Sequence, residues 1–162
     1  MLELLKKLCD LPGPSGEENA VRNFIREQAA EYADEIRTDP MGNLMIFRAG
    51  VHKPVKPLMV CAHMDEIGLI VKRITDDGMI KFGFVGGVDP RVVIGRRVKF
   101  GDTIGVIGIK AVHLTKPAER RKMPATKDLY IDIGATSKSA AQQKVSLGDL
   151  HAFDGFVCYD IL

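Results

Sequence analysis

Tryptophan is absent from this chain and cysteine is scarce. The 162 residues hold three cysteines, Cys9, Cys61 and Cys158, and no two of them have Cys-x-x-Cys spacing. This argues against a disulfide framework or a thiolate zinc site and favours a reducing compartment, so we expect a cytoplasmic location. No run approaches the roughly 18 apolar residues of a membrane span, so no membrane partner is expected.

The chain also lacks an excess of charge of one sign. Its formal net charge is +2, and few aromatic residues accompany the basic clusters at residues 91–97 and 120–122. We interpret these clusters as solvated or interface positions and expect no nucleic-acid partner. Glycine patterns that cradle phosphates are missing too. The remaining signal is a 46% apolar composition, which suits one globular domain or two small ones.

The most informative stretch is residues 58–68. Four residues that can pack inside a sheet lead directly to His63, Asp65 and Glu66. This order predicts a buried strand that delivers polar groups to a sheet edge. Because side chains alternate along an extended segment, we expect His63 and Asp65 on one face and Glu66 on the other. A histidine and an aspartate on one face can share a site.

Two helices and a hairpin are predicted before this stretch. Leucines at helical spacing predict a short first helix that the Leu-Pro-Gly-Pro segment at 11–14 ends. Ser15 and Glu18 have the spacing of a capping box, and apolar residues then predict a second helix to about Tyr32. A strand pair at 36–38 and 44–47 flanks turn residues.

Short β-like runs separated by glycine or Asp-Gly predict a small antiparallel sheet or barrel after Gly68. A short helix is predicted over residues 137–144. The expected strands are 69–74, 80–85, 92–94, 98–100, 103–109, 129–133 and 145–150.

Seven motifs, taken in order, resemble the M42 family of metallo-aminopeptidases, some of whose members carry endoglucanase names. Single motifs of this kind are weak, but seven in the family's order are strong. They are Gly13-Pro14-Ser15-Gly16-Glu17, Asp39-Pro40-Met41-Gly42-Asn43, Ala62-His63-Met64-Asp65-Glu66-Ile67-Gly68, Gly86-Gly87-Val88-Asp89-Pro90-Arg91, Gly105-Val106-Ile107-Gly108 with His113-Leu114, Tyr130-Ile131-Asp132-Ile133-Gly134-Ala135, and Gly148-Asp149.

The resemblance implies an α/β fold in which a small β-barrel-like domain is inserted into a catalytic α/β/α sandwich domain. Residues 1–68 would be the first part of the catalytic domain, 69–153 the inserted assembly domain, and 154–162 a stub returning to the catalytic domain. The family's site holds two divalent metal ions, usually zinc or cobalt. His63 matches its first metal-binding histidine. Asp65 matches the carboxylate that orients this histidine or supports the metal-water chemistry.

The implied function is a hydrolase, a metal-dependent aminopeptidase that releases N-terminal residues from short peptides and forms homo-oligomers through the inserted β domain. The family's other metal ligands lie downstream of Leu162, so we expect little or no activity from this chain alone. The alternative is a non-catalytic truncated subunit or assembly module, with Val92–Ile94 beside Arg91 as a contact surface. An endoglucanase is disfavoured, because its two carboxylates must lie about 5 to 10 Å apart and face one bond. The side chains of Asp65 and Glu66 should instead point in different directions.

Other polar residues keep simpler interpretations. Glu66 has two open roles, a capping or salt-bridging carboxylate or a residue at the edge of the site. Asp89-Pro90-Arg91 is interpreted as a turn with an ion pair, with a subunit interface as the second possibility. His113 and Asp132 are interpreted as structural hydrogen-bonding residues.

Overall fold

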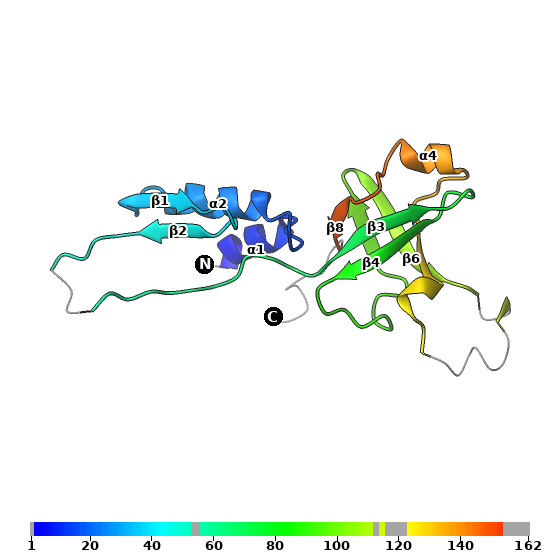
Figure 1. The fold of residues 1–162 in the computed structure, drawn as a ribbon, viewed down its shortest axis with the longest axis horizontal. Helices are drawn as coiled ribbons and strands as arrows, with labels where there is room; N and C mark the ends of the chain where they lie inside the picture. The colour runs from blue at the N-terminus through cyan, green and yellow to red at the C-terminus, as the bar shows by residue number, and fades with distance from the viewer. Residues whose placement is uncertain (1, 53–55, 112–113, 116–122, 154–162) are drawn as a thin grey trace.

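The computed structural model describes residues 2–52, 56–111, 114–115 and 123–153. Figure 1 shows two groups of elements, joined by an extended segment. The predictions for His113, for the basic cluster at 120–122 and for the stub at 154–162 lie outside the described residues.

The first group contains two helices and a hairpin, as predicted. Helix α1 spans Leu2–Asp10 and α2 spans Asn19–Ala29, so α2 ends before the predicted limit at Tyr32. Strands β1 (Glu35–Thr38) and β2 (Leu44–Phe47) pair antiparallel. Helix α2 contacts this hairpin through arginine: Arg22 Nε donates to the Gly42 carbonyl oxygen over 2.7 Å.

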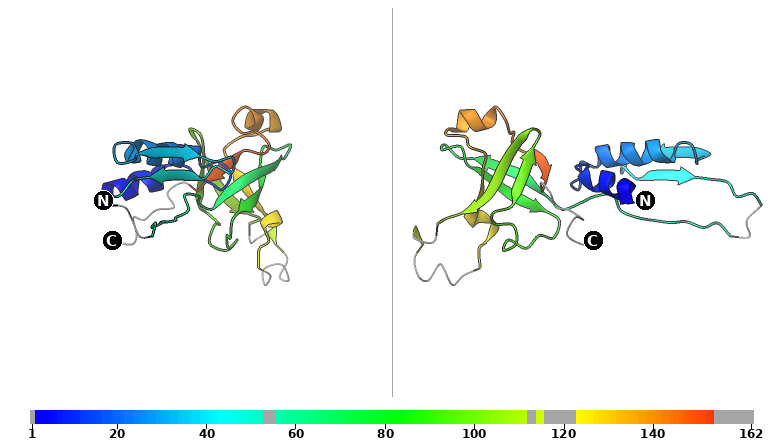
Figure 2. Two further views of the ribbon diagram at one scale, coloured as in Figure 1. Left: turned by 60° about the vertical axis from the view of Figure 1, so that its left-hand side comes forward. Right: turned by 180° about the vertical axis from the view of Figure 1, so that it is seen from behind.

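The second group is a six-stranded antiparallel sheet in the order β5-β6-β7-β4-β3-β8. An isolated bridge between Val98 and Phe153 joins the two edges, so the sheet nearly closes into a barrel, as Figure 2 shows from two sides. This confirms the predicted β-rich texture. The strands are β3 (Gly68–Ile74), β4 (Ile80–Val85), β5 (Arg97–Phe100), β6 (Thr103–Ile109), β7 (Leu129–Asp132) and β8 (Leu150–Ala152).

The hydrophobic core fills this barrel. Alternation is clearest in β5, where Val98 and Phe100 are buried and the residues between and before them are exposed. A register shift between Val71 and Arg73 moves the inward position, so that Ile74 is buried at the end of β3. The short helix α4 (Lys138–Gln142) and the 3-10 turn Thr126–Asp128 complete the described elements.

Two of the strands predicted after Gly68 are wrong. Residues 92–94 form turns, because the Val92 N–H donates to the Asp89 carbonyl and the Arg96 N–H donates to the Val93 carbonyl. Only Val93 enters the core, with 2% of its surface exposed, whereas Val92 and Ile94 stay outside.

The predicted strand at 145–150 begins only at Leu150. Before it, a turn forms in which the Ser146 N–H donates to the Asp149 carboxylate over 2.8 Å, and Gly148 adopts a φ of 87°. That positive φ is incompatible with a continuous strand.

Two predictions about single polar groups are confirmed. The Arg91 guanidinium pairs with the Asp89 carboxylate and lowers its pKa to about 2. Asp132 accepts a hydrogen bond from the Gly134 N–H over 2.8 Å, which is a structural role.

Ser137 caps α4 by accepting from the Ala140 N–H. None of the helices in the described part of the chain is long and apolar enough to cross a membrane.

Candidate functional site

The segment that carries His63 is extended but unpaired. Residues 57–65 lie in no strand, and Leu58, Met59 and Val60 are 90%, 82% and 85% exposed. The predicted buried strand is therefore wrong for this structure. A strand needs a neighbour to satisfy its backbone, and among the described strands β2 pairs only with β1 and β3 only with β4 and β8.

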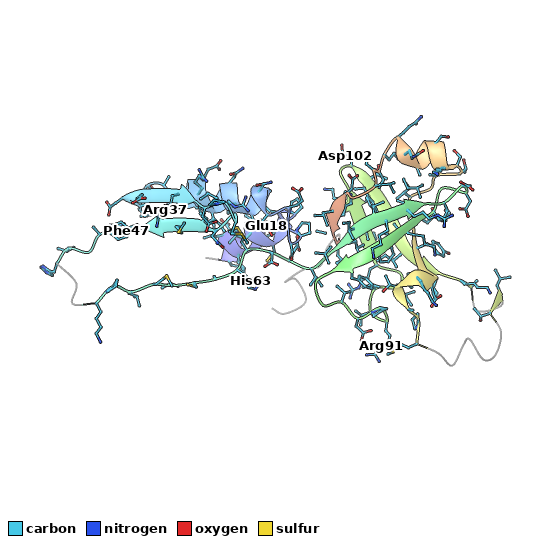
Figure 3. The ribbon with its side chains drawn as sticks, viewed as in Figure 1. Glu18, Arg37, Phe47, His63, Arg91 and Asp102 are labelled. Carbon is cyan, nitrogen blue, oxygen red and sulfur yellow. The ribbon has the colours of Figure 1, made fainter. Side chains whose placement is uncertain are left out.

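His63 and Asp65 lie on one side of this segment and touch. The imidazole Nδ1 lies 3.0 Å from Asp65 Oδ1 and 3.0 Å from the Asp65 backbone oxygen. The predicted pairing of these two side chains is confirmed. Figure 3 shows His63 on the segment that runs past the helices towards the barrel.

The two neighbours of Nδ1 fix the tautomer of His63. A carboxylate oxygen and a carbonyl oxygen both accept hydrogen bonds, so Nδ1 must carry the proton that it donates. In the neutral imidazole this leaves the lone pair on Nε2. The His63 side chain is 85% exposed, so this nitrogen suits a ligand that arrives from outside the described residues.

Asp65 is held from its other side by Ser15. The Ser15 Oγ donates to Asp65 Oδ2 over 2.5 Å, while Oδ1 accepts from His63. The Ser15 hydroxyl lowers the pKa of Asp65 most, burial raises it, and His63 lowers it further. The carboxylate is therefore stabilised as an anion between two donors.

Ser15 reaches Asp65 because residues 13–15 run alongside residue 66. Pro14 and Glu66 form a parallel bridge, in which the Glu66 N–H donates to the Gly13 carbonyl over 2.8 Å and the Ser15 N–H donates to the Glu66 carbonyl over 3.3 Å. The Glu66 side chain strengthens this pairing, since its Oε1 accepts from the Gly13 N–H over 2.9 Å. Burial raises the pKa of Glu66, and the Gly13 N–H partly offsets that effect.

Two glycines at this junction have no room for a side chain unless neighbouring atoms move. A Cβ on Gly13 would stand 2.8 Å from Val21 Cγ2. A Cβ on Gly68 would stand 2.8 Å from Pro14 Cβ and 2.7 Å from the His151 carbonyl oxygen. Close packing of three chain segments therefore locks the site residues in place.

A hollow of about 250 Å³ opens beside these groups. Residues of the two helices make part of its lining apolar, and His63, Asp65 and Glu66 make another part polar. The hollow therefore combines an apolar surface with a histidine and two carboxylates. It is lined by Leu8, Cys9, Leu11, Gly13, Val21, Ile25, His63, Met64, Asp65 and Glu66.

The donor set fits one ligand position of a metal site. Metal-binding histidines commonly donate their second ring N–H to a carboxylate, as His63 does to Asp65. In the part of the chain that the structure describes, no three His, Cys, Asp or Glu side chains come together as a ligand group. A zinc site of three or four protein ligands would need donors beyond these residues.

Sequence reasoning missed Ser15. Its spacing to Glu18 suggested a capping box, but α2 has Glu18 at its N-cap position with no side-chain cap, and Glu18 Oε1 accepts from the Gly16 N–H. The usable signal was the Gly-Pro-Ser-Gly context, in which a short turn keeps Ser15 outside the helix. Glu66 takes a structural role through Gly13 and also lines the hollow.

Fold and site together define a mixed α/β protein with a nearly closed six-stranded barrel and a carboxylate-oriented histidine beside an apolar hollow. Comparison with known proteins identifies the class. The chain belongs to the M42 glutamyl aminopeptidase family, whose sequence profile matches residues 42–158. The predicted family resemblance is thereby confirmed.

Two curated relatives align over most of the chain. A protein of Acetivibrio thermocellus, named as a candidate aminopeptidase, is 43% identical over 155 residues, which are 96% of this chain and 45% of that protein. The lysyl aminopeptidase of Pyrococcus furiosus is 34% identical over an alignment that covers 87% of this chain and 42% of that protein. The chain thus spans less than half the length of either relative.

Solved structures match the fold at similar coverage. A TET aminopeptidase from a marine sediment Thaumarchaeota archaeon is 34% identical, with a TM-score of 0.86. The match covers 94% of this chain and 44% of that protein's chain. A Thermotoga maritima protein described as an endoglucanase is 39% identical, with a TM-score of 0.79 over 92% and 44%. The Pyrococcus horikoshii TET1 peptidase, described as assembling into a tetrahedron or an octahedral shell, is 36% identical, with a TM-score of 0.77 over 94% and 46%.

Proposed function

We propose that this chain provides the first part of a metal-dependent aminopeptidase that removes N-terminal residues from short peptides. The observation that carries the proposal is His63, whose Nδ1 is held by Asp65 and whose Nε2 is left for a metal ion. Membership of the M42 family and relatives named as aminopeptidases support the hydrolase class. Residues 1–68 would then belong to the catalytic sandwich domain, with the barrel inserted after them.

His63 would hold zinc or cobalt, and Asp65 would keep its ring oriented and its basicity high. A bound divalent ion would supply Lewis-acid chemistry, polarising the carbonyl of the first peptide bond and lowering the pKa of a water molecule. The apolar wall of the hollow suits an apolar part of a peptide, because it excludes water without competing hydrogen bonds. The remaining ligands would come from sequence that relatives have beyond the matched region.

A chimera tests this proposal. The chain replaces the matched 155 residues of the Acetivibrio thermocellus relative, and release of N-terminal residues from aminoacyl p-nitroanilides and short peptides is measured with zinc or cobalt and with a chelator. We expect metal-dependent activity in the chimera and none in the 162-residue chain alone. His63→Gln should reduce the chimera's activity by at least about 100-fold, and Asp65→Asn by about 10 to 100-fold.

His52→Gln is the matched control, because His52 lies in a loop and is exposed. The proposal is wrong if the chimera acts equally well in the chelator, if His63→Gln leaves its rate unchanged, or if the chain alone works at a rate typical of enzymes. Hydrolysis of carboxymethylcellulose would instead favour an endoglucanase. We expect none, because Asp65 and Glu66 bond to Ser15 and Gly13 and do not face a common bond.

The alternative is an assembly module without catalysis. Val92 and Ile94 are 57% and 40% exposed beside Arg91, which suits a contact between copies, and the TET1 peptidase is a relative that assembles. Val93, predicted to share this surface, is buried and takes no part. Sedimentation of the chain, alone and mixed with the full-length relative, tests this reading, and a monomer that ignores the relative would exclude it.

A further inference from the structure

We propose that Ser15 is a positioning residue of the site, whose hydroxyl fixes Asp65 so that His63 keeps its proton on Nδ1 and presents Nε2. The part of this inference that concerns a metal ion rests on the proposed function. The hydrogen-bond chain from Ser15 through Asp65 to His63 does not, because all of its atoms belong to the described residues.

The hydrogen-bond chain from Ser15 to His63 uses both oxygens of the Asp65 carboxylate. Asp65 Oδ2 accepts from Ser15 over 2.5 Å and Oδ1 accepts from His63 over 3.0 Å. A carboxylate bonded on one side only can rotate about its side-chain torsions, since the Asp χ2 well is broad. Two donors, one on each oxygen, remove that freedom. The orientation of the His63 ring, which donates to Oδ1, is then fixed as well.

The same geometry separates Ser15 from nucleophilic serines. In a Ser-His-Asp triad the hydroxyl donates its proton to the histidine, which then acts as the base. Here the Ser15 hydroxyl donates to Asp65 Oδ2, whereas His63 donates to Oδ1. The hydroxyl therefore supports the carboxylate and is not poised for attack.

The position of Ser15 does not depend on its own side chain. Its N–H donates to the Glu66 carbonyl, and the neighbouring Gly13 exchanges two further hydrogen bonds with Glu66. Gly16, which follows, has a φ of 100° and turns the chain away towards α2. Replacing the hydroxyl by hydrogen should therefore leave this backbone pairing intact and remove only the contact to Asp65.

The decisive readout is the tautomer of His63, measured by 15N NMR of the imidazole in the metal-free 162-residue chain, with the parent and the variants compared at the same pH. We expect the Nδ1–H form in the parent chain. Ser15→Ala should shift the signals part of the way towards the Nε2–H form that free imidazole prefers, because it frees the Asp65 carboxylate while the Asp65 backbone oxygen still lies 3.0 Å from Nδ1. Ser15→Thr, which keeps the hydroxyl, should restore the parent spectrum.

Ser139→Ala is the control, because Ser139 lies in α4, where its hydroxyl is 3.1 Å from the Ser137 hydroxyl. Backbone amide spectra check that each variant is folded. If Ser15→Ala does not fold, Ser15→Cys decides, since a thiol is a weak donor and should give an intermediate shift. A parent-like tautomer in a folded Ala or Cys variant overturns the inference, and so does a Thr variant that behaves like Ala.

Cobalt affinity of the chimera separates this inference from the proposed function. We expect Ser15→Ala to weaken cobalt binding by about 10 to 100-fold and Ser15→Thr to restore it. If Ser15→Ala changes the tautomer of His63 but leaves the cobalt affinity unchanged, the metal-binding role of His63 is overturned. The inference that Ser15 positions Asp65 would still stand.

Discussion

His63 and His151 lie in opposite environments, although each is two residues from an aspartate. The His63 side chain is 85% exposed and hydrogen-bonded to Asp65. His151 is 17% exposed and packs against Phe100, with ring centroids 4.3 Å apart and ring planes tilted by 58°. His151 Nε2 is buried with no hydrogen-bond partner among the described residues, and the Asp149 carboxylate is 3.8 Å away. Exposure thus leaves His63 open to a ligand, and burial disfavours the charged form of His151.

This burial makes barrel stability depend on pH. Burial lowers the pKa of His151 below its usual 6.5, although Asp149 and a backbone contact at Lys99 oppose the shift. As pH falls below that usual value, the unfolded chain binds a proton that the folded chain does not, so the free energy of unfolding falls. We expect the fall to set in as the pH drops below 6.5, the usual pKa of histidine, and chemical denaturation at a series of pH values measures it.

His151→Gln should flatten that dependence, because the amide does not titrate. His52→Gln, at an exposed loop position, should leave it unchanged. Equal slopes in the parent and in His151→Gln would show that His151 does not carry the effect.

At the scale of elements, local pattern predicted the barrel well and the site segment poorly. Alternation of apolar residues identified β4 (Ile80–Val85) and β6 (Thr103–Ile109) at their observed limits, since each strand has one face in the core. The same apolar signal failed at residues 58–60, where the described structure offers no neighbouring strand. An apolar run shows that a segment can be buried but does not identify what buries it.

Ser15 shows a second limit of local pattern. The capping box predicted from Ser15 and Glu18 is an interaction within one helical turn, whereas the observed partner of Ser15, Asp65, lies 50 residues away. The pairing of His63 with Asp65 was predictable because it follows from alternation over three residues. The Ser15 contact follows from the parallel pairing of two distant segments, which spacing does not reveal.

The junction of these segments should be sensitive to a single methyl group. Gly68→Ala places a Cβ 2.7 Å from the His151 backbone oxygen and 2.8 Å from Pro14 Cβ. We expect a loss of about 1 to 3 kcal/mol in the free energy of unfolding, because backbone atoms must move. Denaturant titration measures this.

Gly87→Ala is the matched control, since a Cβ there meets nothing within 4 Å, and its effect should stay within about 0.5 kcal/mol. Equal effects of the two substitutions would contradict the close packing described at Gly68.

At the scale of the whole molecule, buried apolar side chains concentrate in the barrel. Of the buried hydrophobic residues in the described part of the chain, Val21 belongs to the first group of elements, and the others lie between residues 69 and 153. Helix α1 buries none of its residues. Resistance to unfolding should therefore differ along the chain, because apolar burial supplies most of it.

Native-state hydrogen exchange measures that difference. We expect amides of β3, β4 and β7 to exchange far more slowly than those of α1, because these strands enclose the core. Equal protection of α1 and the barrel strands would show that the first group is stabilised by contacts other than those described.

The metal content of the chimera tests the central claim most directly. After purification with excess zinc and removal of free metal, elemental analysis counts the ions retained per chain. We predict two ions in the parent chimera, as a two-metal hydrolytic site requires, and fewer in the His63→Gln variant, with His52→Gln equal to the parent. Equal metal content in His63→Gln and the parent would contradict the account, because His63 would then be no ligand.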